Sequence, residues 1–330
     1  MNSEQKKYFL DEIRRYSGPK KYILTQLQIP RRTYYNWLKV SEEKGLAGLT
    51  DGRIMRIGSW NQLIPEEEKR VLEIARDFPV LSPRLLAVKI TDEEEFSVSE
   101  TKVYALLKQE GLIDPRPITD LPAAKEWHHK TTRLDEIWQC DATHYFIVGW
   151  GYYKQISVLD DYSRFIPGWD LKPDETAFSI SEVLEQTIEN ARQLEHLLDG
   201  TRPLFLSDNG PGFTADLLAN YLSAHGIRHI FGKPYHPQTQ GKVERYQRGI
   251  KEKVCLLVYC SPEQLKQAIA QAVTQYNATP HKALNNVSPQ DVYAGRKEEI
   301  LRKRLVKKEL TMARRKLYNL NKQKSVRSNP

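Results

Sequence analysis

Residues 137–170 have the sequence IWQCDATHYFIVGWGYYKQISVLDDYSRFIPGWD. Gly149, Gly151 and the polar run Asp160–Ser163 divide this stretch, and such residues are typical of turns. The segments between them are rich in β-branched and aromatic residues, as strands are: Ile137–Ile147, Tyr153–Leu159 and Arg164–Asp170. The stretch therefore predicts three strands that follow one another in a meander.

Helix and strand patterns alternate after this meander. In chain order they are helix Thr176–Leu198, strand Pro203–Ser207, helix Thr214–His225, strand Arg228–Phe231, a helix from Gly241 to about Cys255 and a helix from Pro262 to Asn277. Gly232–Gln240 has the composition of a loop. A meander followed by this alternation predicts an α/β fold, namely a mixed five-stranded sheet flanked by helices in ribonuclease H topology.

The chain before the meander is predicted to be all-α. In residues 1–58, apolar residues at helical spacing over Lys20–Leu27 are interrupted at Gln28-Ile29-Pro30, and a second helix starts at Arg31. Two helices joined by a short turn are typical of a helix-turn-helix DNA-binding domain, whose second helix enters the major groove. An ordinary helical hairpin would show the same pattern.

Residues 59–113 repeat the helical pattern. Pro65 followed by three Glu residues indicates a helix start, and Ser97 with Glu100 predicts a capping box for a later helix. We predict a second helix-turn-helix or winged-helix-like domain here. A linker over 114–133, the α/β core over 134–295 and a basic tail over 296–330 complete the predicted organisation.

Positive charge is concentrated at the C-terminus. The chain has 50 Lys+Arg and 42 Asp+Glu, a net charge of +8, and residues 296–330 alone hold 13 basic and 3 acidic residues. Such a segment is expected to bind a polyanion such as nucleic acid, because each neutralised phosphate releases condensed counterions. A solvated tail without a specific partner is the alternative.

The sequence lacks the features of membrane and secreted proteins. Its longest apolar run, Tyr145–Tyr153, has nine residues, whereas a membrane-spanning helix needs about 20. The N-terminal residues have no apolar stretch of the kind found in signal peptides. Cys140, Cys255 and Cys260 form no Cys-x-x-Cys pair, which disfavours a disulfide framework and a thiolate zinc site. We therefore expect a soluble cytoplasmic protein with no membrane partner and no zinc.

Three carboxylates occupy positions from which they can converge. Asp141 lies within the first predicted strand, Asp208 directly after a buried strand, and Glu244 in the first turn of a helix. Clustered carboxylates repel one another unless a cation lies among them. All-oxygen sites with open positions suit Mg²⁺ or Mn²⁺, and two such ions can support an in-line displacement at phosphorus. Asp160 and Asp161 are rivals for this role, although turn geometry would also explain them.

Five stretches in order along residues 134–295 resemble the catalytic core shared by retroviral integrases and bacterial insertion-sequence transposases, the D,D(35)E group. They are Trp138–Thr143, Val158–Trp169, Ser207–Phe213, His236–Lys251 and Tyr276–Tyr293. The resemblance implies that Asp141, Asp208 and Glu244 form the family's catalytic, metal-binding triad and hold two Mg²⁺ or Mn²⁺ ions. The upstream helical regions resemble those of insertion-sequence transposases, and the His-His-Cys-Cys zinc module of retroviral integrases is absent from the sequence.

The reaction implied by this resemblance is phosphoryl transfer on double-stranded DNA by a DDE transposase. Metal-activated water cleaves a phosphodiester at each element end, and the freed 3′-OH then attacks target DNA directly. Joining two ends to one target implies at least a homodimer on DNA, associated with the nucleoid in the bacterial cytoplasm. A non-catalytic DNA-binding regulator descended from a transposase, or a simple metal-dependent nuclease, is the alternative.

One group of expected DNA contacts lies at the start of the helix that begins at Arg31. Arg31, Arg32 and Thr33 open this helix, with Tyr35 beside them. Residues in the first turn of a recognition helix reach base edges in the major groove. We therefore expect Arg31, Arg32 and Thr33 to read the terminal inverted repeats of the element, while Tyr35 contacts the DNA backbone.

A second group of expected DNA contacts surrounds Glu244. Arg248 and Lys251 follow it by four and seven residues, so they share its face of the helix. Basic residues at these two positions also occur in retroviral integrases, which this sequence resembles. Tyr235 and Gln240 would border the same site from the preceding loop.

Overall fold

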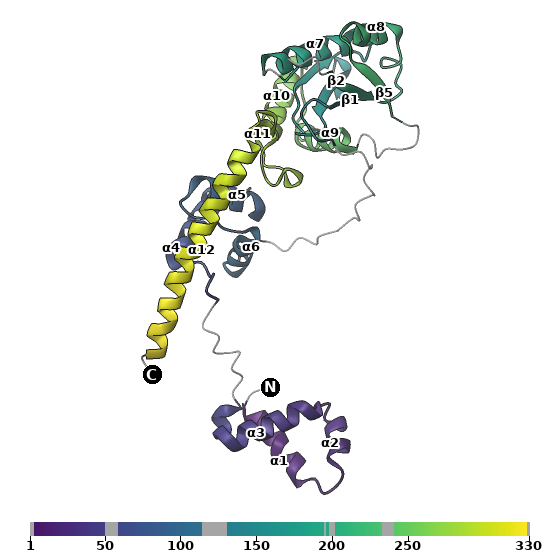
Figure 1. The fold of residues 1–330 in the computed structure, drawn as a ribbon. Coiled ribbons are helices and arrows are strands. Elements are labelled where there is room, and N and C mark those ends of the chain that lie inside the picture. The colour runs from purple at the N-terminus through teal and green to yellow at the C-terminus, as the bar shows by residue number, and fades with distance from the viewer. Residues whose placement is uncertain are drawn as a thin grey trace. The chain divides into compact units, whose positions relative to one another are not determined.

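The structure is a computed structural model, and it describes residues 3–49, 59–113, 131–194, 196–197, 202–232 and 241–328. The chain divides into two compact units, of which one contains Met1–Glu67 and Met312–Pro330 and the other contains Glu68–Thr311. Most of the predicted linker, residues 114–130, lies outside the described residues. Figure 1 labels the α-helices of both units and the strands β1, β2 and β5.

A three-helix domain opens the first unit. It consists of α1 (Ser3–Arg15), α2 (Lys20–Gln26) and α3 (Arg31–Gly48). The predicted interruption follows α2, where Gln28 has a φ of 53° and Pro30 is the N-cap of α3. Side chains from all three helices and the turns beside them form the core: Leu10, Ile13, Leu24, Ile29, Tyr34 and Leu49. The predicted pair of helices around a short turn is confirmed, with α1 packed against α3.

Three further helices follow: α4 (Pro65–Asp77), α5 (Pro83–Glu93) and α6 (Glu100–Gln109). The predicted capping box for α6 is wrong by two residues. Ser99, not Ser97, is the N-cap, and its hydroxyl accepts a hydrogen bond from the Lys102 amide. The Ser97 amide instead donates to the Thr311 hydroxyl at 2.9 Å, so Ser97 belongs to the chain that leads into the helix.

The α/β core contains a mixed five-stranded sheet in the order β3-β2-β1-β4-β5. Its strands are β1 (Ile137–Ile147), β2 (Gly151–Asp160), β3 (Gly168–Lys172), β4 (Leu204–Ser207) and β5 (Arg228–Phe231). β2 is antiparallel to β1 and to β3, whereas β4 is parallel to β1 and β5 is parallel to β4. The predicted meander and the mixed sheet of ribonuclease H topology are confirmed.

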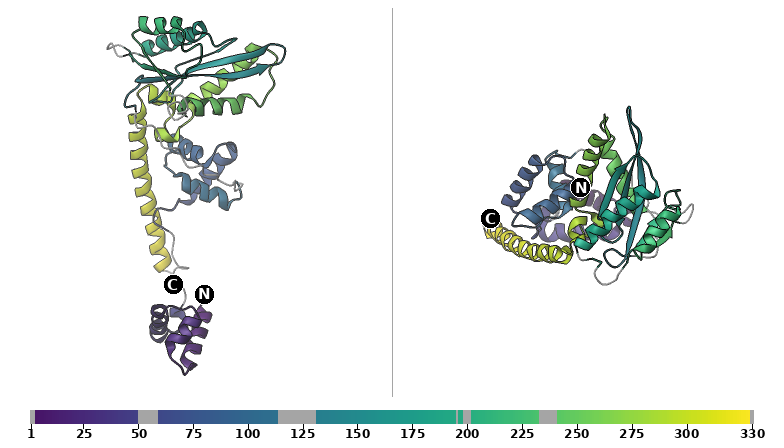
Figure 2. Two further views of the ribbon diagram at one scale, coloured as in Figure 1. Left: turned by 90° about the vertical axis from the view of Figure 1, so that its right-hand side faces the viewer. Right: turned by 90° about the horizontal axis from the view of Figure 1, so that it is seen from above.

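Helices cover both faces of this sheet (Figure 2). α7 (Ala177–Gln193) and α8 (Asp216–Ala224) lie on one face, and α9 (Gly241–Val254) and α10 (Pro262–Ala278) lie on the other. Because side chains alternate along a strand, β1 contributes to both cores. Trp138 and Cys140 pack under α7 and α8, whereas Tyr145 and Ile147 pack against α9 and α10.

The third strand starts later than its sequence predicts. The sequence predicts a strand over Arg164–Asp170, but β3 covers Gly168–Lys172. Arg164 has a φ of 63°, and the Asn277 side chain binds both backbone groups of Ile166, at 3.1 Å to the nitrogen and 3.4 Å to the oxygen. Since a side chain on α10 takes these backbone groups, pairing with β2 begins only at Gly168.

The C-terminal segment continues through the 3-10 helix η2 (Lys282–Leu284) and α11 (Pro289–Tyr293) into α12 (Lys297–Ser328). The predicted basic tail is thus a 32-residue helix. In the second unit, Arg304 Nε and Nη2 donate to the two carboxylate oxygens of Asp92, each at 2.6 Å. The Lys307 ammonium donates to the backbone carbonyl oxygens of Thr91 and Glu94. Part of the tail's positive charge therefore binds the helical segment of the same chain. No helix in the described part of the chain, α12 included, has the length and apolar character needed to cross a membrane.

The end of α12 belongs to the first unit and contains a buried ion pair. Arg315 Nε donates to Glu67 Oε2 at 2.7 Å, and the two side chains are only 5% and 2% exposed. The same carboxylate oxygen accepts from the Ile64 amide at 3.1 Å. Asn319 adds hydrogen bonds to two backbone carbonyl groups of the same segment. This end of the helix is therefore a folded part of the first unit.

Candidate functional site

Asp141 and Asp208 lie at neighbouring positions of two parallel strands. In the register of β1 and β4, Gln139 is opposite Leu206, and each aspartate follows two residues later. Alternation keeps Asp141 on the same side of β1 as Gln139, which hydrogen-bonds to α9. Asp208 comes directly after β4. Both carboxylates therefore lie where β4 ends, the edge at which α/β sheets commonly bind ligands.

Glu244 approaches the same place from α9. It lies in the first turn of that helix, next to Val243, whose amide donates to the Gln139 side chain at 3.3 Å. Because Gln139 precedes Asp141 by two residues, this bond fixes the start of α9 beside the strand that carries Asp141. The three expected carboxylates thus come from elements that the fold brings together.

The Asp141 carboxyl group is half-buried in a negatively charged environment. Burial raises its pKa to about 7, opposed by the hydrogen bond from the Ala142 amide and reinforced by the charges of Asp208, Glu244 and Glu175. A cation among these groups would favour the charged carboxylate instead. The cluster is therefore electrostatically suited to bind one.

Glu175 is a fourth carboxylate of this cluster, which the sequence patterns did not single out. It lies between β3 and α7, and its Oε2 is 3.3 Å from His144 Nε2. A Cβ at Gly212 would lie 2.0 Å from the Glu175 carbonyl oxygen, so the loop after Asp208 approaches Glu175 closely because that position has no side chain. A lone Glu just before the N-cap of a helix has no chemical signature that could have marked it.

The donor set of the site suits a hard divalent cation. Carboxylate oxygens from Asp141, Asp208 and Glu244 are the ligands that Mg²⁺ and Mn²⁺ prefer, with positions left for water and phosphate. Among the described residues, no group of three or more His, Cys, Asp and Glu side chains is gathered closely enough to hold a metal ion as it stands. Asp208 is exposed, whereas Asp141 and Glu244 are half-buried.

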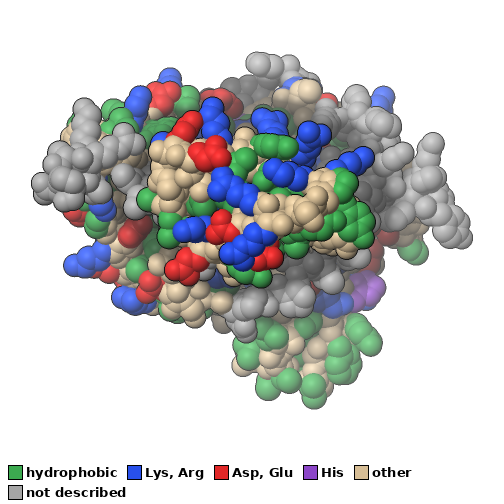
Figure 3. Space-filling view, turned by 90° about the horizontal axis from the view of Figure 1, so that it is seen from below, with side chains coloured by type: hydrophobic (Ala, Val, Ile, Leu, Met, Phe, Trp, Pro, Cys, Tyr) green, Lys and Arg blue, Asp and Glu red, His purple; other side chains and the backbone are tan. Residues whose placement is uncertain are grey.

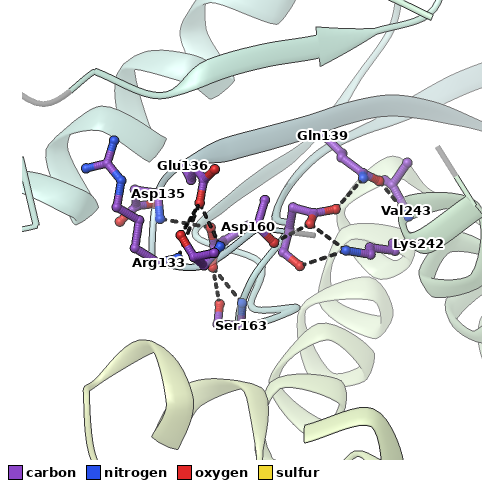
Figure 4. A network of polar contacts seen from close by, with 11 residues as sticks. Arg133, Asp135, Glu136, Gln139, Asp160, Ser163, Lys242 and Val243 are labelled. Carbon is purple, nitrogen blue, oxygen red and sulfur yellow. Dashed lines mark hydrogen bonds and ion pairs between the residues drawn. The ribbon is translucent and has the colours of Figure 1, made fainter. Parts of the chain in front are cut away.

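The rival acids Asp160 and Asp161 have protein partners. Asp160 Oδ2 accepts hydrogen bonds from the Ser163 amide at 2.8 Å and from the Ser163 hydroxyl at 2.5 Å. Asp161 accepts from Gln139 at 2.6 Å and from Lys242 at 2.5 Å. Figure 4 shows this network beside the start of α9. Because both carboxylates are engaged by donors of the protein, their geometry favours a structural role over a metal site.

The first turn of α3 presents the residues expected to read DNA. Arg31 and Arg32 are exposed, Thr33 is half-buried and Tyr35 is 43% exposed. The Arg31 guanidinium lies 5.7 Å from the centre of the Tyr35 ring. Tyr34, by contrast, is fully buried in the core of the domain. The buried Tyr34 fixes the helix on its domain, while its neighbours face solvent.

The expected DNA contacts around Glu244 are only partly described. Arg248 and Lys251 are exposed on α9, whereas Tyr235 and Gln240 lie outside the described residues. Figure 3, in which side chains are coloured by type, shows Lys and Arg side chains with Asp and Glu side chains interspersed among them. Arg248 and Lys251 themselves are open to solvent and thus accessible to a ligand.

Models of known domains match most of the chain. Two models of the integrase core domain match residues 131–237 and 225–289. Asp141 and Asp208 lie within the first match and Glu244 within the second. A model of a homeodomain-like domain matches residues 33–107.

Three known proteins illustrate these similarities. The transposase for transposon Tn552 from Staphylococcus aureus is 25% identical over 234 residues, which are 65% of this chain and 48% of that protein. The Gag-Pro-Pol polyprotein of sheep pulmonary adenomatosis virus is 31% identical over 161 residues, 47% of this chain and 8% of that protein. The solved catalytic core domain of BIV integrase is 25% identical with a TM-score of 0.37, and the match covers 50% of this chain and 97% of that one. The chain spans less than half the length of the first two relatives.

Proposed function

We propose that this chain, which contains an integrase core domain and a homeodomain-like helix-turn-helix domain, is a DNA transposase of the DDE type. It would cleave DNA at the ends of a mobile element and join each 3′-OH to target DNA. The observation that carries the proposal is the register of β1 with β4, which sets Asp141 beside Asp208 next to the start of α9. Similarity to a transposase and to retroviral polyproteins supports it.

In this proposal Asp141, Asp208 and Glu244 would hold two Mg²⁺ or Mn²⁺ ions through their carboxylate oxygens. When bound, such ions activate the attacking oxygen and neutralise charge on the leaving oxygen. The half-buried Asp141 gives the site a fixed inner ligand. The exposed Asp208 leaves the outer side of the site open to the DNA backbone.

The remaining expected residues would bind and orient DNA. Residues 1–58 and 59–113 would bind the element ends, with Arg31, Arg32 and Thr33 reading base edges, and residues 134–295 would carry the chemistry. Arg248 and Lys251 would hold phosphates of the terminal nucleotides. Because two ends are joined to one target, at least two copies would assemble on DNA, at the nucleoid of a bacterial cell.

An oligonucleotide assay separates this proposal from its alternatives. The full chain is incubated with Mg²⁺ and a duplex that carries the element end, and the products are resolved on a sequencing gel. Cleavage followed by joining to a second duplex is the expected result. Cleavage without joining would indicate a nuclease, and binding alone would indicate a DNA-binding regulator.

The proposed reading helix predicts a loss of specificity in Arg31→Ala and Arg32→Ala. A base-edge contact is worth about 1–3 kcal/mol of discrimination, so each substitution should narrow the gap between end DNA and random DNA by about 5- to 150-fold. Competition binding measures this gap. Lys39→Ala, an exposed basic position further along α3, is the control. Equal loss of affinity for both DNAs would instead identify Arg31 and Arg32 as phosphate contacts.

The proposed phosphate contacts predict a change in salt dependence. Arg248→Ala combined with Lys251→Ala should lower the slope of log affinity against log salt by roughly two, because two phosphates lose their partners. Fluorescence anisotropy with labelled end DNA over a salt series measures the slope. Lys253, nine residues after Glu244, lies on the opposite side of α9, so Lys253→Ala should leave it unchanged. An unchanged slope in the double variant would show that Arg248 and Lys251 contact no phosphate and are solvated surface residues.

A further inference from the structure

Asp161 is a buried carboxylate outside the candidate triad. Its side chain is only 6% exposed, and it lies in the turn after β2. Gln139 Nε2 donates to its Oδ1 at 2.6 Å, while the Thr131 hydroxyl and the Lys242 ammonium donate to Oδ2 at 2.6 and 2.5 Å. The Lys242 ammonium is a charged donor, whereas the Gln139 amide and the Thr131 hydroxyl are neutral donors, and hydrogen bonds in which one partner is a carboxylate are strong. Asp161 therefore holds its neighbours in a defined arrangement.

The partners of Asp161 lie next to the candidate ligands. Lys242 precedes Glu244 by two residues on α9, and its ammonium also donates to the Asp161 carbonyl oxygen at 3.2 Å. Gln139 precedes Asp141 by two residues on β1. The bonds of Asp161 to Gln139 and Lys242, two residues labelled in Figure 4, thus connect the strand that carries one ligand with the helix that carries another.

Gln139 couples these two connections. Its amide nitrogen donates to Asp161, and its amide oxygen accepts from the Val243 amide at 3.3 Å. A Gln side chain has one donating and one accepting end, so the bond to Asp161 fixes the orientation in which the oxygen faces α9. The first amides of a helix have no partner within the helix. The first turn of α9 therefore depends on contacts of this kind.

We infer that Asp161 is a positioning residue for Glu244. Through Lys242 and Gln139 it fixes the first turn of α9 against β1, so that Glu244 is presented to the same site as Asp141. The inference rests on the proposed function, because it assigns Asp161 to the geometry of the proposed metal site. It also accounts for a buried acid that is itself fully engaged by protein donors and takes no direct part in ion binding.

Asp161→Asn tests this inference in the full chain. The substituted amide can still accept from Gln139, but its nitrogen presents a donor to the Lys242 ammonium in place of an acceptor. We expect Mn²⁺ affinity, measured by the electron paramagnetic resonance of free Mn²⁺, to fall about 10- to 100-fold, as it does when outer partners of metal ligands are lost. Hydrogen exchange of residues 243–247 should accelerate in parallel. Lys242→Met should lower Mn²⁺ affinity and accelerate exchange to a similar extent. Lys242→Arg, which keeps the charge, should retain most of the Mn²⁺ affinity.

Asp170→Asn is the matched control. Asp170 makes a comparable connection, since it accepts from Lys266 at 2.5 Å and from Lys172 at 3.1 Å and thereby joins β3 to α10. Its loss should affect stability, yet Mn²⁺ affinity and exchange at the start of α9 should stay within about twofold, because residues that share no partners act independently and these two lysines lie on β3 and α10.

The outcomes of this experiment are distinct. Unchanged Mn²⁺ affinity in Asp161→Asn would overturn the inference, whether or not exchange of α9 accelerates, because Asp161 would then stabilise the helix without positioning a ligand. The proposed function fails instead if the unsubstituted chain does not bind Mn²⁺, or if Asp141→Asn leaves its Mn²⁺ binding intact. In that case, hydrogen exchange of residues 243–247 in Asp161→Asn would decide whether Asp161 holds the start of α9. Unchanged exchange would show that it does not.

Discussion

Asp141→Asn, Asp208→Asn and Glu244→Gln are each expected to abolish cleavage and joining of end DNA while leaving end binding nearly intact. Each substitution keeps the side-chain volume and removes one carboxylate from the site where β1, the end of β4 and α9 meet. Removing an outer partner of a metal ligand lowers activity about 10- to 100-fold. Removing a ligand itself should lower it further. Binding should persist because the proposed reading residues lie on α3, in the other unit of the chain.

Two exposed acids of the same core serve as controls for the triad substitutions. Asp216 opens α8 and Glu252 lies further along α9. Asp216→Asn and Glu252→Gln should therefore retain cleavage and joining at the level of the unsubstituted chain. If a triad variant keeps more than a few per cent of joining activity, the substituted acid is not one of the catalytic carboxylates.

Arg315→Met is expected to destabilise the first unit by about 3–5 kcal/mol, the usual cost of removing one partner of a buried ion pair. Glu67 would remain 2% exposed without its cation, and an uncompensated buried charge is what makes this loss large. The effect should appear as faster hydrogen exchange of residues 60–67. Free energies of this size correspond to a factor of about a hundred or more in the opening equilibrium.

Arg314→Met is the control for Arg315→Met. It removes the neighbouring arginine, which is exposed, and exposed positions usually change stability by less than about 0.5 kcal/mol. If both variants exchange alike, the ion pair with Glu67 would not stabilise this unit, and the end of α12 would be the solvated tail that its composition also allows.

Local pattern predicts all five strands in chain order, although β3 starts four residues later than the pattern indicates. β1 was predicted with its exact bounds, because eleven consecutive residues of strand-forming composition end at a glycine-rich turn. The alternation of helix and strand after residue 176 then left few ways to arrange five strands. The place of Asp141 in β1, and of Asp208 after β4, followed from this pattern together with the resemblance to integrase cores.

Features that depend on long-range contacts could not be predicted. β3 starts late because Asn277, more than a hundred residues away, binds the backbone of Ile166. Asp161 forms an ion pair with Lys242 on α9, and no spacing along the sequence relates these two residues. The basic tail is a helix partly tied to Glu67 and Asp92, partners that neither composition nor periodicity identifies.

The most direct test of the central claim is the position of bound metal. Crystals of the full chain with end DNA, soaked in Mn²⁺, give anomalous difference density wherever the ion binds. We predict density between the carboxylates of Asp141, Asp208 and Glu244. Density at Asp160 and Asp161, or Mn²⁺ bound without contact to Asp141, would contradict the assignment.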